Sequence, residues 1–295
     1  MNLSILIISY KSIAKLEKCL STIGNNKEVI IVENSNNIDF KDIIEKKYKN
    51  CKVIINNSNL GYGRAANIGF KEIKTQYVIL LNTDTVIKES QIIDIENEIT
   101  NCKDDFALAS PIYDDLIDFS KNNNFDKTLL TNQLDPNNKD SMTKVDLIKG
   151  CALIVNLKKF DNKNIFDDNF FFFFEEIDLC KRLKINDENI YVFNKIKISH
   201  DSAGAIDGQI NSDYGDFRNW NYYWSKFYYH KKHYGFLSSF IKHFSKLIRF
   251  FVSSIIFFFF SKSKFKINKS RFLGLFSSIL GIKSSISDKI LNKSN

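Results

Sequence analysis

The chain has 295 residues, of which 44% are hydrophobic and 26% charged, enough for a large α/β domain with a sizeable core. An aromatic content of 14% excludes intrinsic disorder as a general description, and only 11 Gly and 2 Pro exclude collagen-like and proline-rich classes. The net charge of +8 suggests a polyanionic partner. Residues 236–295 hold 11 Lys and Arg against one acid, which leaves residues 1–235 with a net charge of −2. A nucleic-acid partner for this body is therefore disfavoured.

Apolar runs typical of buried parallel strands alternate with amphipathic segments typical of helices over the first hundred residues. The predicted strands are 3–8, 29–32, 53–55 and 77–81. The predicted helices are 13–23, 38–48, 64–71 and 87–99. This alternation indicates an α/β fold with an open, mostly parallel, Rossmann-like sheet flanked by helices.

The alternation weakens after about residue 110, where 118–144 is polar and Asn-rich and is predicted to be a long surface segment. Strand character returns over 145–155 and 190–198, and 222–234 is aromatic and basic. The five cysteines are widely spaced without a C-x-x-C pair, which favours reduced thiols in a cytosolic protein. The N-terminus leads straight into a strand, so no signal peptide is expected.

The basic tail, 236–295, interleaves apolar residues with cations such as Lys242, Lys246 and Arg249. Its uncharged run Phe250–Ser261 has 12 residues, whereas a spanning helix needs about 20. Cations beside Phe, Leu and Ile suit an anionic membrane surface, so we expect an interfacial helix. Docking on the protein itself or on a partner subunit is the alternative, followed by a true membrane span.

Polar residues follow each predicted strand, where ligands bind in open α/β sheets. Ser9 and Tyr10 follow the first strand, and Glu33 follows the second, where an acid can accept hydrogen bonds from a base or a ribose. Taken alone, Glu33 fits a solvated turn better than a ligand contact. The segment 59–69 places two glycines and Arg64 at the start of a helix, which suits a phosphate or simply a tightly packed helix.

The fourth strand ends in Asn82, Thr83 and Asp84, and a carboxylate there could hold a hard divalent metal. Because one acid is a sparse site, other ligands must come from elsewhere. His200 follows a later strand-like segment and could complete such a site, although a lone His is more often structural.

Five consecutive Phe, 170–174, precede three acids, Glu175, Glu176 and Asp178. An apolar wall raises the pKa of a carboxyl group, so these acids are candidates for proton transfer. A helix N-terminus, where acids interact favourably with the dipole, explains the same pattern without any catalytic role.

Taken together, the order and spacing of these motifs resemble the family 2 glycosyltransferases with the GT-A fold, inverting enzymes that use nucleotide-sugars. The resemblance covers 2–235 and is carried by three segments, 59–67, 81–84 and 166–182. Within the family, the chain is most similar to bacterial rhamnosyltransferase-like and galactofuranosyltransferase-like members. It implies a GT-A domain over 1–235, with a nucleotide-sugar part over 1–100 and an acceptor or catalytic part over 101–235.

The resemblance also implies roles at matching positions. Asp84 and His200 would be ligands of a divalent metal, Mg²⁺ or Mn²⁺, and Glu176 would be the general base, with Glu175 and Asp178 as fallbacks. Gly150 matches a glycine before the acceptor-side strand. The expected nucleotide-sugar contacts are Ser9, Tyr10, Glu33, Asn59, Gly61, Arg64, Asn67, Asn82 and Thr83. The chain has Glu33 and Glu176 where the family usually has Asp, and Asn82 in place of the first Asp of its D-x-D motif.

The expected activity is transfer of a sugar, by resemblance rhamnose, from a nucleotide diphosphate sugar to a saccharide acceptor. We expect this acceptor to be lipid-linked, in cell-surface polysaccharide assembly at the cytoplasmic face of the membrane. Two alternatives stay open. A sugar nucleotidyltransferase would normally carry a glycine- and basic-rich loop after the first strand, which Ser9 to Ser12 lacks. A non-catalytic membrane scaffold would not need the acids that this chain retains.

Overall fold

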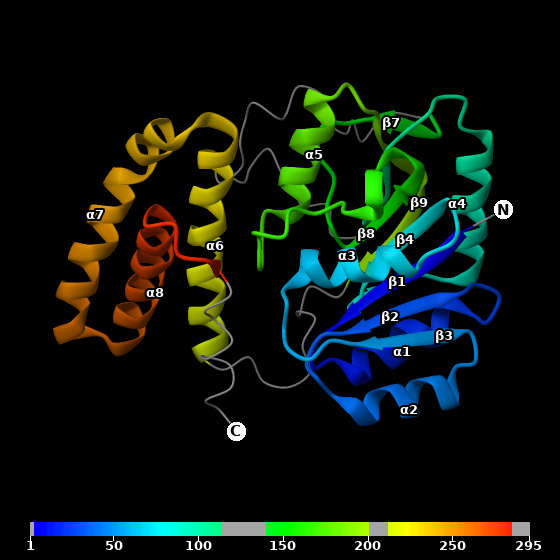
Figure 1. The fold of residues 1–295 in the computed structure, drawn as a ribbon, viewed down its shortest axis with the longest axis horizontal. Helices are drawn as coiled ribbons and strands as arrows, with labels where there is room; N and C mark the ends of the chain where they lie inside the picture. The colour runs from blue at the N-terminus through cyan, green and yellow to red at the C-terminus, as the bar shows by residue number, and fades with distance from the viewer. Residues whose placement is uncertain (1–2, 114–139, 201–211, 285–295) are drawn as a thin grey trace. The chain divides into compact units, whose positions relative to one another are not determined.

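The computed structural model describes residues 3–113, 140–200 and 212–284 (Figure 1). These residues form two compact units. The first comprises Met1–Asn59, Ala65–Phe166 and Glu176–Asp207. The second comprises Leu60–Arg64, Asp167–Glu175 and Gly208–Asn295. The predicted surface segment 118–144 falls mostly outside the described residues.

The secondary structure follows the expected alternation over the first hundred residues. The strands are β1 Leu3–Ser9, β2 Val29–Glu33, β3 Cys51–Ile55, β4 Tyr77–Asn82, β5 Thr85–Val86, β6 Leu108–Tyr113, β7 Met142–Lys144, β8 Ala152–Asn156 and β9 Ile190–His200. The α-helices are α1 Ile13–Ile23, α2 Ile38–Lys47, α3 Tyr62–Glu72, α4 Glu89–Asn101, α5 Glu175–Ile185, α6 Ser212–Tyr234, α7 Phe236–Phe260 and α8 Lys262–Ile279. Two 3₁₀ turns, Leu157–Lys159 and Asp161–Lys163, follow β8.

The first unit is built on one sheet with strand order β3-β2-β1-β4-β8-β6-β9-β5, and β7 pairs with β9. Strands β3, β2, β1 and β4 are parallel, whereas β8 runs antiparallel to both β4 and β6. The α/β fold with a central sheet and flanking helices, predicted from the sequence, is confirmed. The carboxyl ends of β1, β2 and β4 therefore meet at one edge, where the candidate residues lie.

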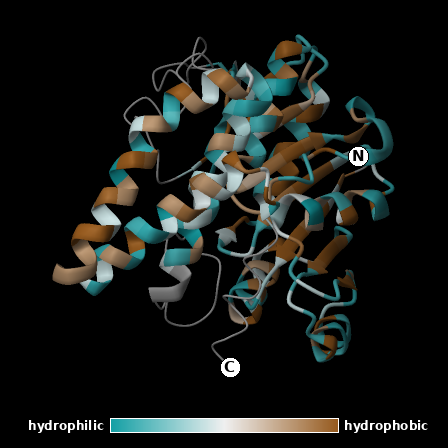
Figure 2. Cartoon of the chain, turned by 60° about the vertical axis from the view of Figure 1, so that its left-hand side comes forward, coloured by the Kyte–Doolittle hydropathy of each residue, from teal (hydrophilic) through white to brown (hydrophobic). Residues whose placement is uncertain are grey.

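Both faces of the sheet are covered, which explains why β1 and β2 are buried along their whole length. Strand residues such as Ile5 and Ile7 share one apolar core with residues of α1 and α4. On the other face, Gly69 lets α3 approach closely, because a side chain there would overlap Leu6 and press on Val32. The apolar strands appear as brown bands in Figure 2.

Four differences from the sequence expectation concern strands. The strands β5, β6 and β7 were not expected, and the expected strand over 145–155 is confined to Ala152–Asn156. All three missed strands pair with β9. Their strand geometry comes from a partner about fifty to a hundred residues away, which local patterns cannot reveal.

The second unit contains the three long helices α6, α7 and α8. The closest approach is between α6 and α8, where Gly274 lies against the backbone of Trp220 with no room for a side chain. Arg271 Nε donates to Asn219 Oδ1 at 2.9 Å, and the Trp224 indole donates to the Ile282 carbonyl at 2.7 Å. Helices α7 and α8 thus form a helical hairpin that packs on α6.

Helix α7 has the reverse of the usual surface pattern. Its buried positions are Ser239, His243, Phe250 and Ser254, so three of the four are polar. Its outward face is apolar, and Figure 2 shows the brown residues along the helices of this unit. The exposed large apolar residues of α7 are Phe236, Leu237, Ile241, Phe244, Ile248, Phe251, Val252, Ile255, Ile256, Phe258, Phe259 and Phe260.

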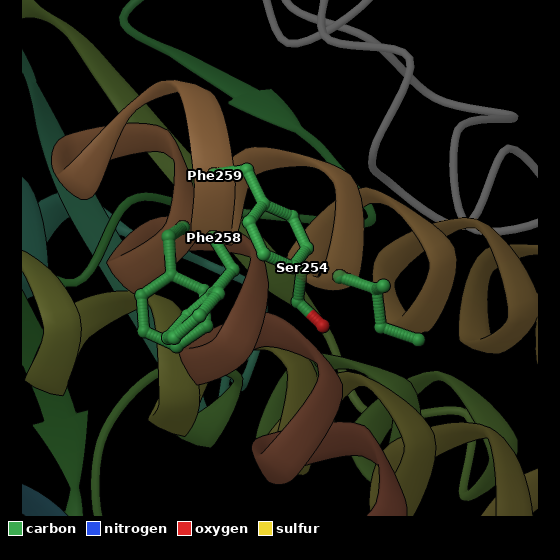
Figure 3. A pocket seen from close by; sticks show the side chains of 5 residues that line it. Ser254, Phe258 and Phe259 are labelled. Carbon is green, nitrogen blue, oxygen red and sulfur yellow. The ribbon is translucent and has the colours of Figure 1, made fainter.

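By length and composition, α7 is the one helix among the described residues that could cross a membrane, and 17% of its most apolar stretch is buried. A recess of about 250 Å³ opens between α7 and α8 near the hairpin turn (Figure 3). Its lining is Ser254, Ile255, Phe258, Phe259 and Phe265, so it is almost wholly apolar.

Candidate active site

The turn after β4 carries three of the predicted residues, and all three are wholly or largely withdrawn from solvent. Thr83 is buried and Asp84 is 7% exposed, while Asn82 is half-buried. The backbone N–H of Asn82 donates to the Cys151 carbonyl at 3.0 Å, and Thr85 Oγ1 donates to the same carbonyl at 3.1 Å. Cys151 therefore fixes both ends of the turn that presents Asp84.

His200 is brought to this turn by strand pairing. Residues Thr85 and Val86 form β5, which pairs antiparallel with the end of β9, so that His200 stands opposite Thr85. The backbone of His200 is therefore one position removed from Asp84 along the pairing. The side chain of His200 lies outside the described part of the structure.

Glu176 lies beside the segment that holds the Asp84 turn. An ideal Cβ added to Gly150 would stand 3.6 Å from the Glu176 carboxyl carbon, and Gly150 is bonded to Cys151. Glu176 therefore lies near Gly150, the residue before the one whose carbonyl holds the two ends of the Asp84 turn. Protein atoms surround the Glu176 carboxyl group, although part of the side chain reaches solvent, and this desolvation raises its pKa.

Asp178, one of the fallback acids, is engaged in a different contact. It is fully buried and accepts a hydrogen bond from Arg182 Nε at 2.8 Å, one helical turn along α5. The Arg182 guanidinium also donates to the Ile165 carbonyl at 2.6 Å. This ion pair fastens α5 to the preceding loop, which favours a structural role for Asp178 over proton transfer.

Glu33 ends β2 with its carboxylate turned to the backbone that follows. It accepts from Ser35 N and Asn37 N, each at 3.0 Å, and from Ser35 Oγ. Asn37 is the N-cap of α2. Glu33 therefore stabilises a turn, which is the structural alternative that the sequence analysis gave for this residue. The turn shapes the loop that follows the carboxyl end of β2.

Two asparagines that sequence analysis did not single out connect three loops at this edge. Asn34 donates to Asn59 Oδ1 at 3.0 Å and accepts from Asn56 Nδ2 at 3.0 Å. The Asn34 backbone N–H also donates to the Ser9 carbonyl at 2.8 Å. We call Asn34, Asn56 and Asn59 the amide ladder. It places the predicted contact Asn59 against the ends of β1 and β2. In the sequence, the only sign of this amide ladder is that its residues come shortly after the ends of predicted strands.

Ser9 and Asn67 both make contacts within the protein. Ser9 Oγ lies 3.1 Å from Ser12 Oγ, and Tyr10, half-buried, follows it. Asn67 Oδ1 accepts from the backbone N–H groups of Ile165 and Phe166, each at 3.0 Å, and its amide donates to the Phe166 carbonyl at 2.8 Å. Asn67 therefore holds the start of the loop that leads to the acids.

The second unit contains Gly61, Arg64 and Glu175. Gly61 has φ of +85°, and a Cβ there would overlap the Phe171 carbonyl oxygen, so both the backbone and the space require glycine. Tyr62 N donates to that same carbonyl at 3.1 Å. Arg64 Nε donates to the Asp168 carbonyl, and Glu175 is buried at the start of α5. Gly61 and Arg64 thus shape and hold the loop of five Phe.

The Phe loop is strained just before the acids. Phe173 and Phe174 have φ of 72° and 73°, a region that bulky residues rarely adopt. Aromatic contacts with α6 hold them there, since the Phe174 ring lies 5.6 Å from Tyr222 and 5.5 Å from Tyr229. Contacts with α6 therefore hold the five Phe in place. The strained backbone of Phe173 and Phe174 directly precedes Glu175.

Comparison with known proteins decides the family. Residues 4–175 match the model of glycosyl transferase family 2, which is more than half of the chain. The chain belongs to glycosyl transferase family 2. A curated relative, the low-salt glycan biosynthesis hexosyltransferase Agl10 of Haloferax volcanii, is 23% identical over 201 residues. The match covers 64% of each chain, so it spans less than two thirds of that relative's length.

Solved structures of glycosyltransferases share the fold of this family 2 member. The mannosyltransferase PcManGT from Pyrobaculum calidifontis, in complex with GDP-Man and Mn²⁺, gives a TM-score of 0.56 at 8% identity, covering 95% of this chain and 87% of that one. S. aureus TarS 1-349 gives a TM-score of 0.52 at 12% identity, covering 95% and 92%. At these identities the likeness concerns the fold alone.

The donor chemistry of the Asp84 turn fits a divalent cation. Asn82 Oδ1 is buried and accepts no hydrogen bond from the described residues, which leaves an oxygen ligand available beside the Asp84 carboxylate. Within the described residues, no three His, Cys, Asp or Glu side chains gather as metal ligands. The charge of Asp84 also affects Cys19. Burial of the Cys19 thiol, together with the smaller effect of this charge, raises the pKa of the thiol to about 12.

Proposed function

We propose that this family 2 member is an inverting glycosyltransferase whose general base is Glu176. The observation that supports the proposal is that Glu176 lies near Gly150, while the carbonyl of the next residue, Cys151, holds both ends of the turn that presents Asp84. A base must reach its proton in a site that also stabilises the leaving group, and this arrangement supplies both functions within a few residues. The raised pKa of Glu176 makes its carboxylate a stronger proton acceptor.

The proposed reaction is a single displacement at the anomeric carbon of a nucleotide diphosphate sugar. Glu176 takes the proton of an acceptor hydroxyl as that oxygen bonds to the anomeric carbon. The bond from this carbon to the diphosphate oxygen breaks, and the nucleoside diphosphate leaves with its electron pair. Because attack comes from the opposite face, the anomeric configuration inverts. Asn67 holds the backbone at Ile165 and Phe166, at the start of the loop that leads to Glu176.

Asp84, Asn82 and His200 are the residues that would hold a divalent metal, Mg²⁺ or Mn²⁺. Such an ion, when bound, neutralises charge that grows on the leaving diphosphate. We assign donor contacts to Ser9, Tyr10, Glu33, Asn59, Gly61, Arg64, Asn67 and Thr83, and the amide ladder would hold Asn59 in place for this task.

We further propose that the donor is a nucleotide-linked hexose, with dTDP-rhamnose as the first candidate, and that the acceptor is a lipid-linked saccharide of cell-surface polysaccharide assembly. Residues 1–235 would carry the chemistry and 236–295 the membrane contact. The outward apolar face of α7 supports a membrane surface. An interfacial position suits it better than a span, because Arg249 lies near the middle of the 25-residue helix and a span would place it in hydrocarbon.

The experiment is a donor screen followed by product analysis. Thermal shift with a panel of nucleotide-sugars, each with Mg²⁺ or Mn²⁺, identifies the donor, since a ligand that binds only the native state raises stability. The selected donor is then incubated with saccharide acceptors. Release of nucleoside diphosphate with an inverted product supports the proposal. Release of pyrophosphate would indicate nucleotidyl transfer, and no turnover across the panel would indicate a scaffold.

A further inference from the structure

The carboxylate of Asp167 joins the start of the Phe loop, Asp167–Glu175, to α6 within the second unit. Tyr228 OH donates to Asp167 Oδ2 at 3.0 Å, and Lys232 Nζ forms an ion pair with the same oxygen at 2.8 Å. Tyr228 and Lys232 are four residues apart, so they lie on one face of α6. Asp167 Oδ1 accepts from the backbone N–H and the side-chain amide of Asn169, at 2.9 and 2.8 Å. We call Asp167, Tyr228 and Lys232 the Asp167 clamp.

The clamp is shielded from water and extended by an aromatic ring. Phe170 is fully buried, and its ring meets that of Tyr228 edge to face, with 5.0 Å between the ring centroids. The Asp167 side chain is 14% exposed. Although burial opposes ionisation of Asp167, the hydrogen bonds from Lys232 and Asn169 hold the pKa of its carboxyl group below the ordinary value. The carboxylate is therefore ionised at neutral pH.

The other end of the Phe loop needs support because its backbone is strained. Phe173 and Phe174 have φ of 72° and 73°, and bulky residues keep such angles only where the surrounding structure enforces them. Glu175 and Glu176 follow directly and begin α5. Relaxation of this backbone towards an ordinary conformation would therefore move the first turn of α5 and both acids with it.

Helix α6 supplies this support along the loop. Beyond the clamp, Ser225 Oγ donates to the Phe172 carbonyl at 3.0 Å, and the aromatic contacts of Phe174 follow. The clamp fixes the end of the loop that is farther from the acids, eight residues before Glu175. It can therefore be altered without removing any group from the candidate active site.

We propose that Asp167 is a positioning residue for sugar transfer. Through Tyr228 and Lys232 it fixes the start of the Phe loop on α6, and the loop in turn sets the place of Glu176. This inference rests on the proposed function in that Glu176 is the general base. It gives α6 a task in catalysis that is separate from the membrane contact assigned to 236–295.

The test measures sugar transfer, donor affinity and hydrogen exchange in the full-length chain. D167N keeps the shape of the side chain and removes its charge. We expect kcat to fall by about 10–100-fold, since small misplacements of a catalytic group have effects of this size, while donor affinity changes by less than about threefold. Amide hydrogens of the Phe loop should exchange about tenfold faster or more, because the loop opens more readily without the clamp.

Variants of Lys232 separate positioning from a general loss of stability. K232M should reproduce the effect of D167N, and K232R, which keeps the cation, should retain most of the activity. D167N/K232M should lose no more than the larger single loss, since both substitutions act through one contact. The matched control, K27M/E96Q, removes a 2.7 Å ion pair of similar exposure, 19% and 14%. Lys27 precedes β2, at the end of this strand opposite the candidate site, so transfer should stay near the wild-type value.

The melting temperature of each variant verifies folding. Wild-type kcat in D167N, an equal loss in the control, or unchanged exchange of the Phe loop would overturn the proposal. If D167N does not fold, the comparison of K232M with K232R decides, since both leave Asp167 in place.

The same measurements separate this inference from the proposed function. Hydrogen exchange needs no substrate, so a wild-type chain without transfer activity would refute the proposed function, while faster exchange in D167N would still support the hold of Asp167 on the loop. Transfer that is abolished in E176Q but intact in D167N would refute this inference alone.

Discussion

Gly150 lies against the side chain of Glu176, and a methyl group at position 150 would stand 3.6 Å from the carboxyl carbon. That distance is ordinary van der Waals contact, so alanine fits, whereas a branched side chain would have to displace the carboxyl group. We expect G150A to retain activity within about twofold and G150V to lose at least tenfold in kcat, since misplaced catalytic groups lose roughly this much or more.

For the variants at position 150, steady-state kinetics of sugar transfer gives kcat, and a separate binding measurement gives the affinity for the donor. Donor affinity should stay near the wild-type value in both variants, because Gly150 contacts the acid and not the donor in this assignment. A fully active G150V would show that the contact with Glu176 has no bearing on catalysis.

Substitution of Glu176 tests the base directly. E176Q keeps the shape and removes the proton acceptor, so kcat should fall by about 10²–10⁴ with donor binding unchanged. Near wild-type turnover in E176Q would remove this residue from the mechanism, and Glu175 would then be tested in the same way.

The pH dependence of the wild type follows from the raised pKa of Glu176. The base acts only when ionised, so activity is present above its pKa and lost as pH falls through it. The acid limb of the kcat/KM profile should therefore lie above about 4.3, the ordinary pKa of a Glu side chain. An acid limb at or below that value would contradict the desolvation of this carboxyl group.

Asp178 should matter for stability and not for proton transfer. D178N leaves Arg182 without its buried carboxylate, and we expect a loss of about 2–4 kcal/mol in the free energy of unfolding, near the lower end for buried pairs because Arg182 is 31% exposed. Urea unfolding measures this loss. The control K47Q removes an exposed ion pair with Glu17 and should leave the free energy of unfolding close to the wild-type value. A folded D178N that has lost kcat by orders of magnitude would make Asp178 catalytic.

Gly61 should tolerate no side chain. G61A meets both a left-handed backbone and the Phe171 carbonyl, so it should lower the free energy of unfolding by at least about 1–2 kcal/mol. The matched control is G215A, because no atom lies within 4 Å of a Cβ at Gly215. Thermal unfolding of the two variants separates the cases. A G61A protein as stable as G215A would show that the loop readily adopts another conformation.

The apolar face of α7 should govern membrane binding. I241S/I248S removes two exposed apolar side chains, 68% and 46% exposed, and should reduce partition into anionic vesicles about tenfold or more. The control I38S/I93S changes equally exposed isoleucines of the first unit and should bind as the wild type does. Equal binding by all three proteins in a vesicle co-sedimentation assay would place the membrane contact elsewhere.

Sequence patterns were sufficient for the elements whose signal is local. The apolar runs of β1, β2 and β4 and the helical periodicity of α1 identified the parallel half of the sheet. The strand β5 could not be predicted, because two residues acquire strand geometry only through pairing with β9.

The same contrast applies to the candidate site. Motif order indicated Asp84, Glu176 and Gly150, but Cys151, whose carbonyl holds the Asp84 turn, carries no chemical signal of its own. Asn34 and Asn56 were likewise overlooked, because the amide ladder exists only when the segments that follow β2 and β3 meet. The ion pair of Asp178 with Arg182 does follow an i, i+4 spacing that the sequence displays.

The inverted polarity of α7 has a consequence for the protein in free solution. With serines and a histidine turned inward and phenylalanines turned outward, the helix has no covering in water. The most accessible covering at high concentration is the same face of another copy, which is the usual fate of a large exposed apolar patch. Purified protein should therefore self-associate reversibly in buffer and disperse in mild detergent. The α7–α8 hairpin, and not the first unit, should determine its solubility.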